Sequence, residues 1–123
     1  MSASHVNIAG LADALREFTS RRDWDQFHSP KNLAIALSVE STELLEPFQW
    51  LTTEQSSAEE LGFQQVARIA EEPADVLIYL VRLADVLGVD LDQAVARKLA
   101  TNAEKYPVDR IRGSSAKYSE YEK

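Results

Sequence analysis

Two pairs of acidic residues are the part of the sequence best able to do chemistry. Glu40 and Glu43 form one pair, Glu72 and Asp75 form the other, and the residues of each pair are three positions apart. On a helix this spacing puts both carboxylates of a pair on one face, about 5–6 Å apart at Cβ. Each pair adjoins a strongly apolar stretch, so packing of those stretches would bring four carboxylates into one cleft. Such a cluster repels itself unless cations neutralise it, which indicates a metal site.

The types of ligand favour magnesium over zinc or iron. An oxygen-only cluster of carboxylates suits Mg²⁺ or Mn²⁺. The sequence has no cysteine, and neither His5 nor His28 follows a glutamate by three residues, so thiolate zinc sites and the Glu-x-x-His motif of di-iron bundles are excluded. Magnesium held by carboxylates meets substrate phosphates, so we expect hydrolysis at phosphorus. Either acidic pair alone is more typical of a solvated helix face.

Aromatic side chains near these acids provide candidate contacts for a nucleobase. Trp24, Trp50 and Tyr79 could stack on a base, and Tyr79 follows the second acidic pair by one helical turn. Phe27 and Phe48 are instead expected to fill the helical core. The sequence therefore allows a site with a metal–phosphate half and a base-binding half.

Helical periodicity predicts the all-α elements that must position these residues. No strand-like alternation, glycine-rich loop or internal repeat is evident. Capping residues and helix breakers place the predicted helices at about 8–22, 30–46, 57–87 and 90–105. Pro73 lies inside the third of these, so we expect a kink or a break near residues 71–72 that disturbs the placement of Glu72.

The two central helices are expected to bury their apolar stripes. In the second predicted helix, Glu40 continues the stripe that contains Leu33 and Leu37, so its carboxylate should be buried. In the third predicted helix a polar stripe runs from the second acidic pair through Tyr79 to Arg82. Beside it lies the expected core stripe of that helix: Val76, Leu80, Leu83 and Leu87.

Composition limits the number of domains and the kinds of partner. A chain of 123 residues with 45% hydrophobic and 27% charged residues is typical of one globular domain, here 1–123. The net charge of −7 argues against binding to nucleic acid polymers or anionic membranes. With no secretory signal or membrane span evident, a cytoplasmic protein is the default expectation. Residues 1–6 are interpreted as a loose end, and about 108–123 as either an ordered flap or a disordered tail.

A wider pattern joins these motifs along nearly the whole chain, from about Leu11 to Tyr118. It comprises the segments 22–33, 40–43, 48–50, 75–85 and 98–107, the last ending in Asn-Ala-Glu-Lys-Tyr-Pro. The acidic pairs alone are moderately specific, but their combination with the tryptophan segments and this ending is much more so. The pattern resembles the MazG-like, all-α nucleoside triphosphate pyrophosphohydrolases, and most closely their dCTP pyrophosphatase branch.

The resemblance implies a fold and an activity. The fold would be a four-to-five-helix bundle that assembles as a dimer or as a dimer of dimers (a homotetramer). The activity would be Mg²⁺-dependent hydrolysis of dCTP or a modified dCTP to the monophosphate and pyrophosphate, with metal-activated water attacking the α-phosphorus, as a clean-up of the nucleotide pool. Alternatives are a pyrophosphohydrolase for another non-canonical triphosphate, or a non-catalytic helical oligomer that senses nucleotides or binds a partner.

The resemblance also implies roles for individual residues. The four acids Glu40, Glu43, Glu72 and Asp75 would hold magnesium, with Mn²⁺ as a substitute, and form the catalytic centre. Six further residues would contact the nucleotide: Trp24, Trp50, Tyr79, Asn102, Lys105 and Tyr106. The sequence departs from the family pattern at Pro47 and Pro73, where helix-favouring residues are expected.

Overall fold

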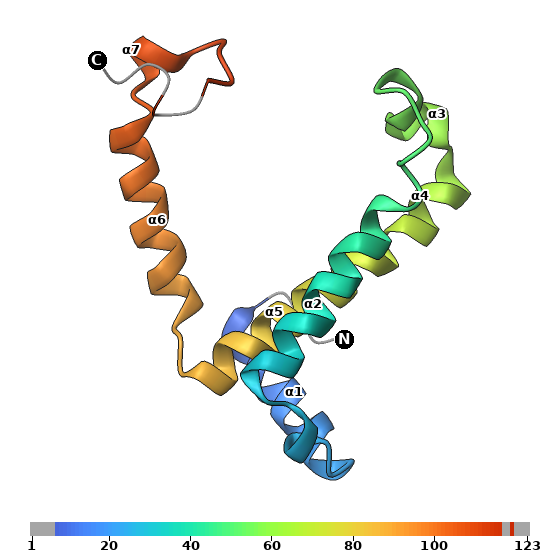
Figure 1. Cartoon of the computed structure of the whole chain (residues 1–123), viewed down its shortest axis with the longest axis vertical. Helices are drawn as coiled ribbons and strands as arrows, with labels where there is room; N and C mark the ends of the chain where they lie inside the picture. Colours follow the sequence, from blue (N-terminus) through green and yellow to red (C-terminus); the bar gives the residue numbers. More distant parts are fainter. Residues whose placement is uncertain (1–6, 117–118, 120–123) are drawn as a thin grey trace. The chain divides into compact units, whose positions relative to one another are not determined.

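The computed structural model describes residues 7–116 and Ser119, and every regular element in them is helical (Figure 1). The elements are α1 Ile8–Arg21, η1 Asp25–Phe27, α2 Pro30–Leu45, η2 Glu54–Ser56, α3 Ala58–Leu61, α4 Phe63–Ile69, α5 Glu71–Leu87, α6 Leu91–Lys105 and α7 Val108–Ile111. The all-α prediction is thus confirmed for these residues. Within them, no helix is both long enough and apolar enough to cross a membrane. The predicted loose end at 1–6 lies outside the described residues, as does part of the predicted tail.

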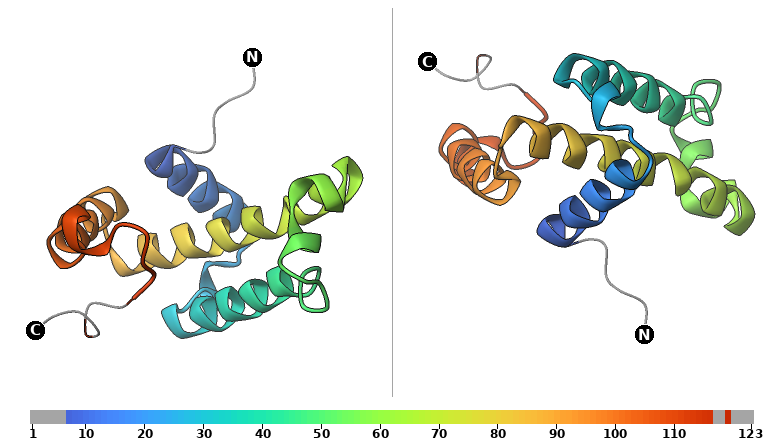
Figure 2. Two further views of the ribbon diagram at one scale, coloured as in Figure 1. Left: turned by 90° about the horizontal axis from the view of Figure 1, so that it is seen from above. Right: turned by 90° about the horizontal axis from the view of Figure 1, so that it is seen from below.

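The chain divides into two compact units, Met1–Val89 and Asp90–Lys123. In the first unit, α5 packs against both α2 and α1 and lies between them in the two views of Figure 2. The short helices α3 and α4 lead from the end of α2 back to the start of α5. The second unit contains α6 and α7. A single domain over 1–123 stays a prediction.

Local capping signals explain where three of the helices begin. Asn7, Ser29 and Asp90 precede α1, α2 and α6, and the side chain of each accepts a hydrogen bond from the backbone N–H three residues further on. Pro30 occupies the first position of α2, where its missing N–H removes no helical hydrogen bond. Gly88 closes α5 in the left-handed conformation, with φ of 72°. These observations confirm the predicted starts of α1, α2 and α6.

The prediction of one long helix over 57–87 is wrong, because the segment forms α3, α4 and α5. Gly62 separates α3 from α4 with φ of 82° and ψ of 162°, which is not a helical conformation. The expected break near residues 71–72 is confirmed, since α5 begins at Glu71. Pro73 is therefore the third residue of α5, where a backbone N–H has no intrahelical partner to lose.

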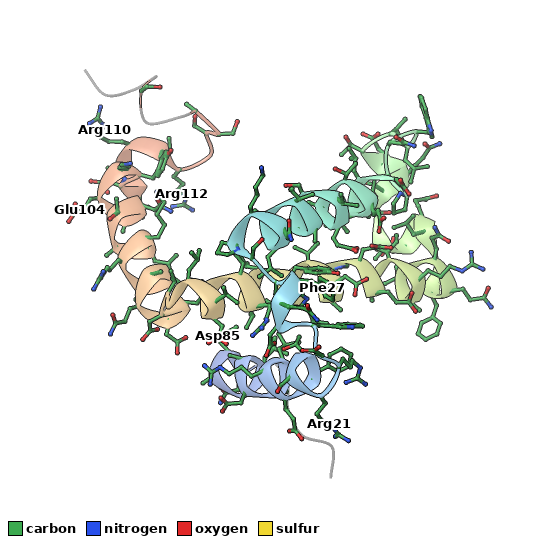
Figure 3. All side chains as sticks on the ribbon, turned by 60° about the horizontal axis from the view of Figure 1, so that its bottom comes forward. Arg21, Phe27, Asp85, Glu104, Arg110 and Arg112 are labelled. Carbon is green, nitrogen blue, oxygen red and sulfur yellow. The ribbon has the colours of Figure 1, made fainter. Side chains whose placement is uncertain are left out.

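The core of the first unit is small and differs in part from the expected one. Its buried apolar residues, among those described, are Leu11, Ala12, Leu33, Val81 and Ala84. The expected core stripe of α5 is wrong at Leu80 and Leu87, which are exposed, because α5 packs between two helices and buries the Val81–Ala84 side instead. Phe27 does not fill the core either: it lies in the η1 turn and is 59% exposed (Figure 3).

Candidate functional site

Three of the four predicted acidic residues come together between α2 and α5. One carboxylate oxygen from each of Glu40, Glu43 and Glu72 lies within 4.8 Å of the corresponding oxygens of the other two, and all three residues are half-buried. Glu40 and Glu43 share a face of α2, and Glu72 comes from the first turn of α5, which packs against α2. Asp75 lies one turn further along α5, is exposed, and is not part of this group of three.

The pKa of Glu40 is raised above the ordinary value for glutamate. Burial is the largest cause, because it disfavours the charged carboxylate. The negative charge of Glu43 and a hydrogen bond with Glu43 add to the rise, followed by the charges of Asp75 and Glu72. All four predicted acids therefore interact electrostatically, although three of them make the close contact.

The pKa of Glu72 is raised for the same reasons. Burial again comes first, and the charges of Glu43 and Asp75 follow. Glu46 and Glu71 add further repulsion, a contribution that the sequence analysis missed. The signal was present, since Glu46 follows Glu43 by three residues and Glu71 precedes Glu72 directly.

Two carboxylate oxygens of this cluster lack the partners that burial normally requires. Oε2 of Glu40 and Oε2 of Glu72 are buried, and neither has a hydrogen-bond partner in the described structure. Within residues 7–89, the ion pairs of Arg16 and Arg82 are made with other acids. A buried anionic oxygen without a donor is costly, and a bound cation removes the cost. Three converging carboxylates with two unpartnered oxygens fit a hard divalent metal ion.

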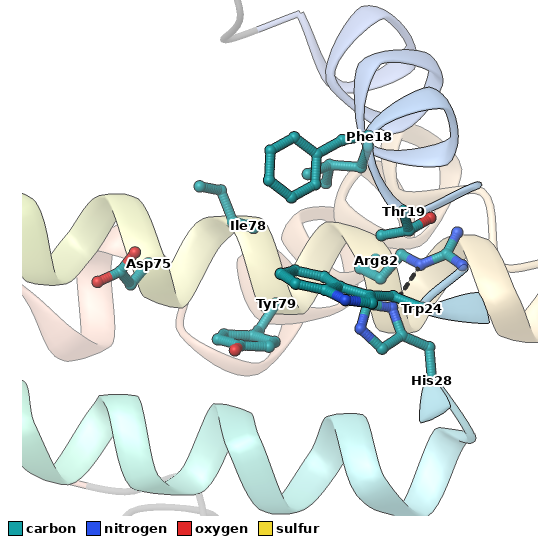
Figure 4. Close-up of a pocket in the computed structure, with 9 residues that line it drawn as sticks. Phe18, Thr19, Trp24, His28, Asp75, Ile78, Tyr79 and Arg82 are labelled. Atoms are coloured by element: carbon teal, nitrogen blue, oxygen red, sulfur yellow. Dashed lines mark hydrogen bonds between the residues drawn. The ribbon is translucent and has the colours of Figure 1, made fainter. Parts of the chain in front are cut away.

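A cavity of about 160 Å³ lies beside α5, walled by α1 and by the segment that joins α1 to α2 (Figure 4). The residues that line it include Phe18, Trp24, His28, Asp75, Tyr79 and Arg82. Trp24 and Tyr79 were predicted to contact a base, and both line this cavity. Asp75 lines it as well while repelling Glu40 and Glu72, so the cavity adjoins the acid cluster.

The position of Trp24 follows from how α1 ends. Asp23 adopts a left-handed conformation with φ of 54°, and the N–H groups of Asp23 and Trp24 donate to the carbonyl oxygens of Ser20 and Thr19 at 3.1 and 2.9 Å. This is the Schellman arrangement, with Asp in the position that glycine usually occupies. The Trp24 ring then meets Phe18 edge to face, with ring centroids 5.7 Å apart. The helix end and this ring contact together set the tryptophan against the cavity.

Four of the predicted nucleotide contacts do not line this cavity. Trp50 lies in the turn after α2 and is 88% exposed. Asn102, Lys105 and Tyr106 belong to the other unit, at the end of α6, where the Tyr106 N–H donates to the carbonyl oxygen of Asn102. The roles of these four residues stay predictions.

The sequence analysis missed His28 and Arg82 as parts of the cavity wall. The sequence analysis considers His28 only as a metal ligand, and it places Arg82 on the polar stripe that runs from the second acidic pair. The structure buries Arg82 and joins it to His28 and Asp25 by hydrogen bonds. Their separation by more than 50 residues explains why local patterns do not reveal this contact.

Comparison with known proteins places this geometry in a family. A family model described as the MazG-like family matches residues 35–121. dCTP pyrophosphatase 1 from Bos taurus is 47% identical over 104 residues, which cover 85% of this chain and 62% of that protein. The Homo sapiens protein of the same name is 46% identical over 104 residues, covering 85% of this chain and 61% of its own length. The aligned part of this chain thus spans about 62% of the length of these curated relatives.

A solved structure agrees with the match in sequence. The crystal structure of a pyrophosphatase from Archaeoglobus fulgidus is similar to this chain with a TM-score of 0.75 and 43% sequence identity. The similarity covers 87% of this chain and 98% of that one, so it includes most of the helices described above. On the evidence of the family model and of these relatives, the chain belongs to the MazG-like family.

Proposed function

We propose that the chain is a nucleoside triphosphate pyrophosphohydrolase that converts dCTP, or a modified dCTP, to the monophosphate and pyrophosphate. The observation that carries this proposal is the cluster of Glu40, Glu43 and Glu72, with its two unpartnered buried oxygens, next to an aromatic cavity. The acid cluster suits a metal and the phosphates that accompany it, and the cavity suits a base. The names of the relatives, dCTP pyrophosphatase 1 and pyrophosphatase, support the same reaction.

Mg²⁺ is the metal that the donor set favours, with Mn²⁺ as a substitute. Glu40, Glu43 and Glu72 would hold it, and Asp75 would complete the ligands from one turn further along α5. When bound, the metal would neutralise charge on the phosphates and activate water for attack on the α-phosphorus. The protein's own contribution is to hold these carboxylates close together, at an electrostatic cost that is visible in the raised pKa values of Glu40 and Glu72.

The cavity is large enough for a single-ring base. Its volume is about 160 Å³, close to that of an engineered protein cavity of about 150 Å³ that binds benzene. Trp24 and Tyr79 provide aromatic surfaces for a base, and Asp75 lies toward the acid cluster, where the phosphates would be. This arrangement supports a pyrimidine nucleotide that spans the cavity and the metal.

The remaining predicted contacts would come from outside this cavity. Asn102, Lys105 and Tyr106 at the end of α6 are proposed to contact the nucleotide, and so is Trp50 in the turn after α2. A dimer or a dimer of dimers would allow Trp50 of one copy to reach the site of another, which would explain a tryptophan that is 88% exposed in the single chain.

The direct test is release of pyrophosphate from a panel of nucleoside triphosphates in the presence of Mg²⁺. We expect dCTP or a modified dCTP to be the best substrate and Glu43→Gln to lose at least about 100-fold in kcat/KM, because electrostatic stabilisation by a metal is worth several kcal/mol. Glu59→Gln is the matched control, since Glu59 is an exposed residue of α3 outside the cluster. Binding of dCTP and Mg²⁺ without turnover would indicate a nucleotide sensor, and turnover by Glu43→Gln at the wild-type rate would reject the proposed site.

A further inference from the structure

Arg82 is a buried arginine whose ion pairs, among the described residues, are with Asp25 and Asp85 and not with the acid cluster. It is 8% exposed, and it lines the cavity from α5. Its Nε donates to Nδ1 of His28 at 3.1 Å, and its Nη2 donates to Oδ1 of Asp25 at 2.9 Å (Figure 4 draws the contact with His28). Thr19 donates its hydroxyl to the same Asp25 oxygen at 2.7 Å. One guanidinium therefore contacts two residues of the segment between α1 and α2, one at the start of η1 and one directly after it.

The direction of the contact with His28 determines where the imidazole carries its proton. A guanidinium has only donors and stays protonated in proteins, so Nδ1 of His28 must be the acceptor. A neutral imidazole that accepts at Nδ1 carries its hydrogen on Nε2. Among the described residues, the His28 ring makes one hydrogen bond, which it accepts from Arg82. Nε2 is thus the ring nitrogen left for a ligand in the cavity that His28 lines.

The charges around His28 also favour its neutral form. The pKa of His28 is lowered, first by burial and then by the positive charge of Arg82 on α5, while Asp25 in η1 partly offsets the effect. The other ionisable groups that line the same cavity are Asp75 and Tyr79. Protonation at Nδ1 would also break the hydrogen bond from Arg82, so the contact and the charge act in the same direction.

We propose that Arg82 is a positioning residue, which holds His28 in the Nε2–H tautomer as a hydrogen-bond donor to the base in the cavity. Such a donor would recognise an acceptor atom on a pyrimidine, such as the O2 carbonyl or the unprotonated ring nitrogen of cytosine. The identity of the ligand rests on the proposed function, whereas the tautomer rests only on the contact between Arg82 and His28.

The first test measures the imidazole directly by NMR of the full chain labelled with ¹⁵N-histidine. His5 and His28 are the only histidines, so His5→Gln leaves one imidazole to observe. We expect Nε2 to be protonated and Nδ1 unprotonated at pH 8, and the ring to stay neutral below the ordinary histidine pKa of about 6.5. Arg82→Met should raise that pKa and mix the tautomers.

Arg16→Met is the matched control for the NMR test. Arg16 belongs to the same group of ion pairs, donating to both carboxylate oxygens of Asp85 at 2.7 and 2.6 Å, but it does not contact His28. It should therefore leave the His28 signals unchanged. A wild-type ring protonated on Nδ1 would overturn the proposal, even if Arg82→Met failed to fold. Unchanged His28 signals in a folded Arg82→Met protein would overturn it as well.

The second test separates binding from turnover with dCTP at pH 8. Loss of one hydrogen bond to the base should raise KM about three- to tenfold in Arg82→Met with kcat nearly unchanged. His28→Gln, whose amide can donate from near the Nε2 position, should keep more affinity than His28→Met. Arg16→Met should keep the wild-type KM. Equal weakening by His28→Gln and His28→Met, or a loss confined to kcat in Arg82→Met, would leave Arg82 a purely structural residue.

The two tests also separate the inference from the proposed function. If no triphosphate were turned over, the proposed function would fail, while the NMR measurement of the His28 tautomer would still decide the role of Arg82. If dCTP were turned over but the tautomer did not depend on Arg82, the inference alone would fail.

Discussion

At the scale of single residues, the acid cluster opposes the stability of the metal-free protein. The pKa values of Glu40 and Glu72 are raised in the folded protein, whereas the pKa of glutamate in an unfolded chain is about 4.3. At pH values between the unfolded pKa and the raised folded pKa of these glutamates, the folded state binds more protons than the unfolded state. The free energy of unfolding therefore falls as pH rises through this window. A divalent cation that binds only the folded cluster should restore the loss.

We therefore predict that Glu40→Gln makes the metal-free protein more stable at pH 8. The variant removes a buried charge that is repelled by its neighbours, so its advantage should shrink as pH falls toward the ordinary glutamate pKa. Urea unfolding in EDTA across this pH range measures the effect. Mg²⁺ should then stabilise the wild type by about 2.7 kcal/mol at roughly 100 times its Kd, and the variant much less.

Glu59→Gln again serves as the control for this prediction, because Glu59 is exposed and outside the cluster. It should show neither the pH-dependent gain nor the loss of stabilisation by Mg²⁺. Equal free energies of unfolding for the wild type and Glu40→Gln at pH 8, together with equal stabilisation by Mg²⁺, would mean that the cluster is not a metal site.

Which of these residues could be predicted depends on how local their signal is. The convergence of Glu40, Glu43 and Glu72 was predictable, because helical spacing sets each face and the apolar stretches indicate which faces pack. Sequence reasoning expected Pro73 to disturb Glu72, yet Asp75 is the acid that lies outside the close group. Which acid comes closest depends on how α5 is rotated against α2, and no local pattern encodes that rotation.

At the scale of elements, helix boundaries were predictable wherever a side chain caps them. Asn7, Ser29 and Asp90 begin helices for a reason that is visible in the sequence. The break at Gly62 was missed because the residues around it are compatible with a helix, and a single glycine is tolerated inside one. The difference lies in the backbone of Gly62, whose φ and ψ of 82° and 162° suit essentially glycine alone.

A pair of glycine substitutions should therefore have opposite effects on stability. Gly62→Ala should destabilise the protein by about 1–3 kcal/mol through backbone strain alone, since an added Cβ would meet no atom within 4 Å. Gly10→Ala lies inside α1, where a Cβ would make only ordinary contacts with Asn7 at 3.7–3.8 Å. It should stabilise the protein by about 0.5–1 kcal/mol.

Urea unfolding at one fixed protein concentration would compare the two glycine variants with the wild type. The contrast in sign is the decisive feature, because both changes add the same methyl group. If Gly62→Ala were as stable as Gly10→Ala, the break between α3 and α4 would not depend on the glycine.

At the scale of the whole molecule, apolar surface is exposed on the elements that form the site. Ile35 and Val39 lie one turn apart on α2 and are 53% and 50% exposed. Val39 also borders a groove on α2 that is lined by Glu43 of the acid cluster. In the other unit, Val95 and Leu99 repeat this spacing on α6 and are exposed as well. Exposed apolar residues paired at helical spacing indicate a helix face that packs against a further surface, such as another copy of the chain.

We predict that the wild type sediments as a dimer or a tetramer at micromolar concentration and that Val39→Asp shifts it toward monomers. The added charge would have to be buried without a partner in an interface that covers this face of α2. Lys31→Asp is the control, since it changes the charge in the first turn of the same helix by a larger amount and removes no large apolar side chain. It should leave the sedimentation coefficient unchanged.

Activity measured on the same samples links assembly to the site. If copies complete one another's nucleotide contacts, the monomeric Val39→Asp should lose turnover while its α-helical content stays that of the wild type. A wild type that is monomeric and fully active would show that a single chain suffices, and that burial of the exposed face of α2 against another copy has no part in catalysis.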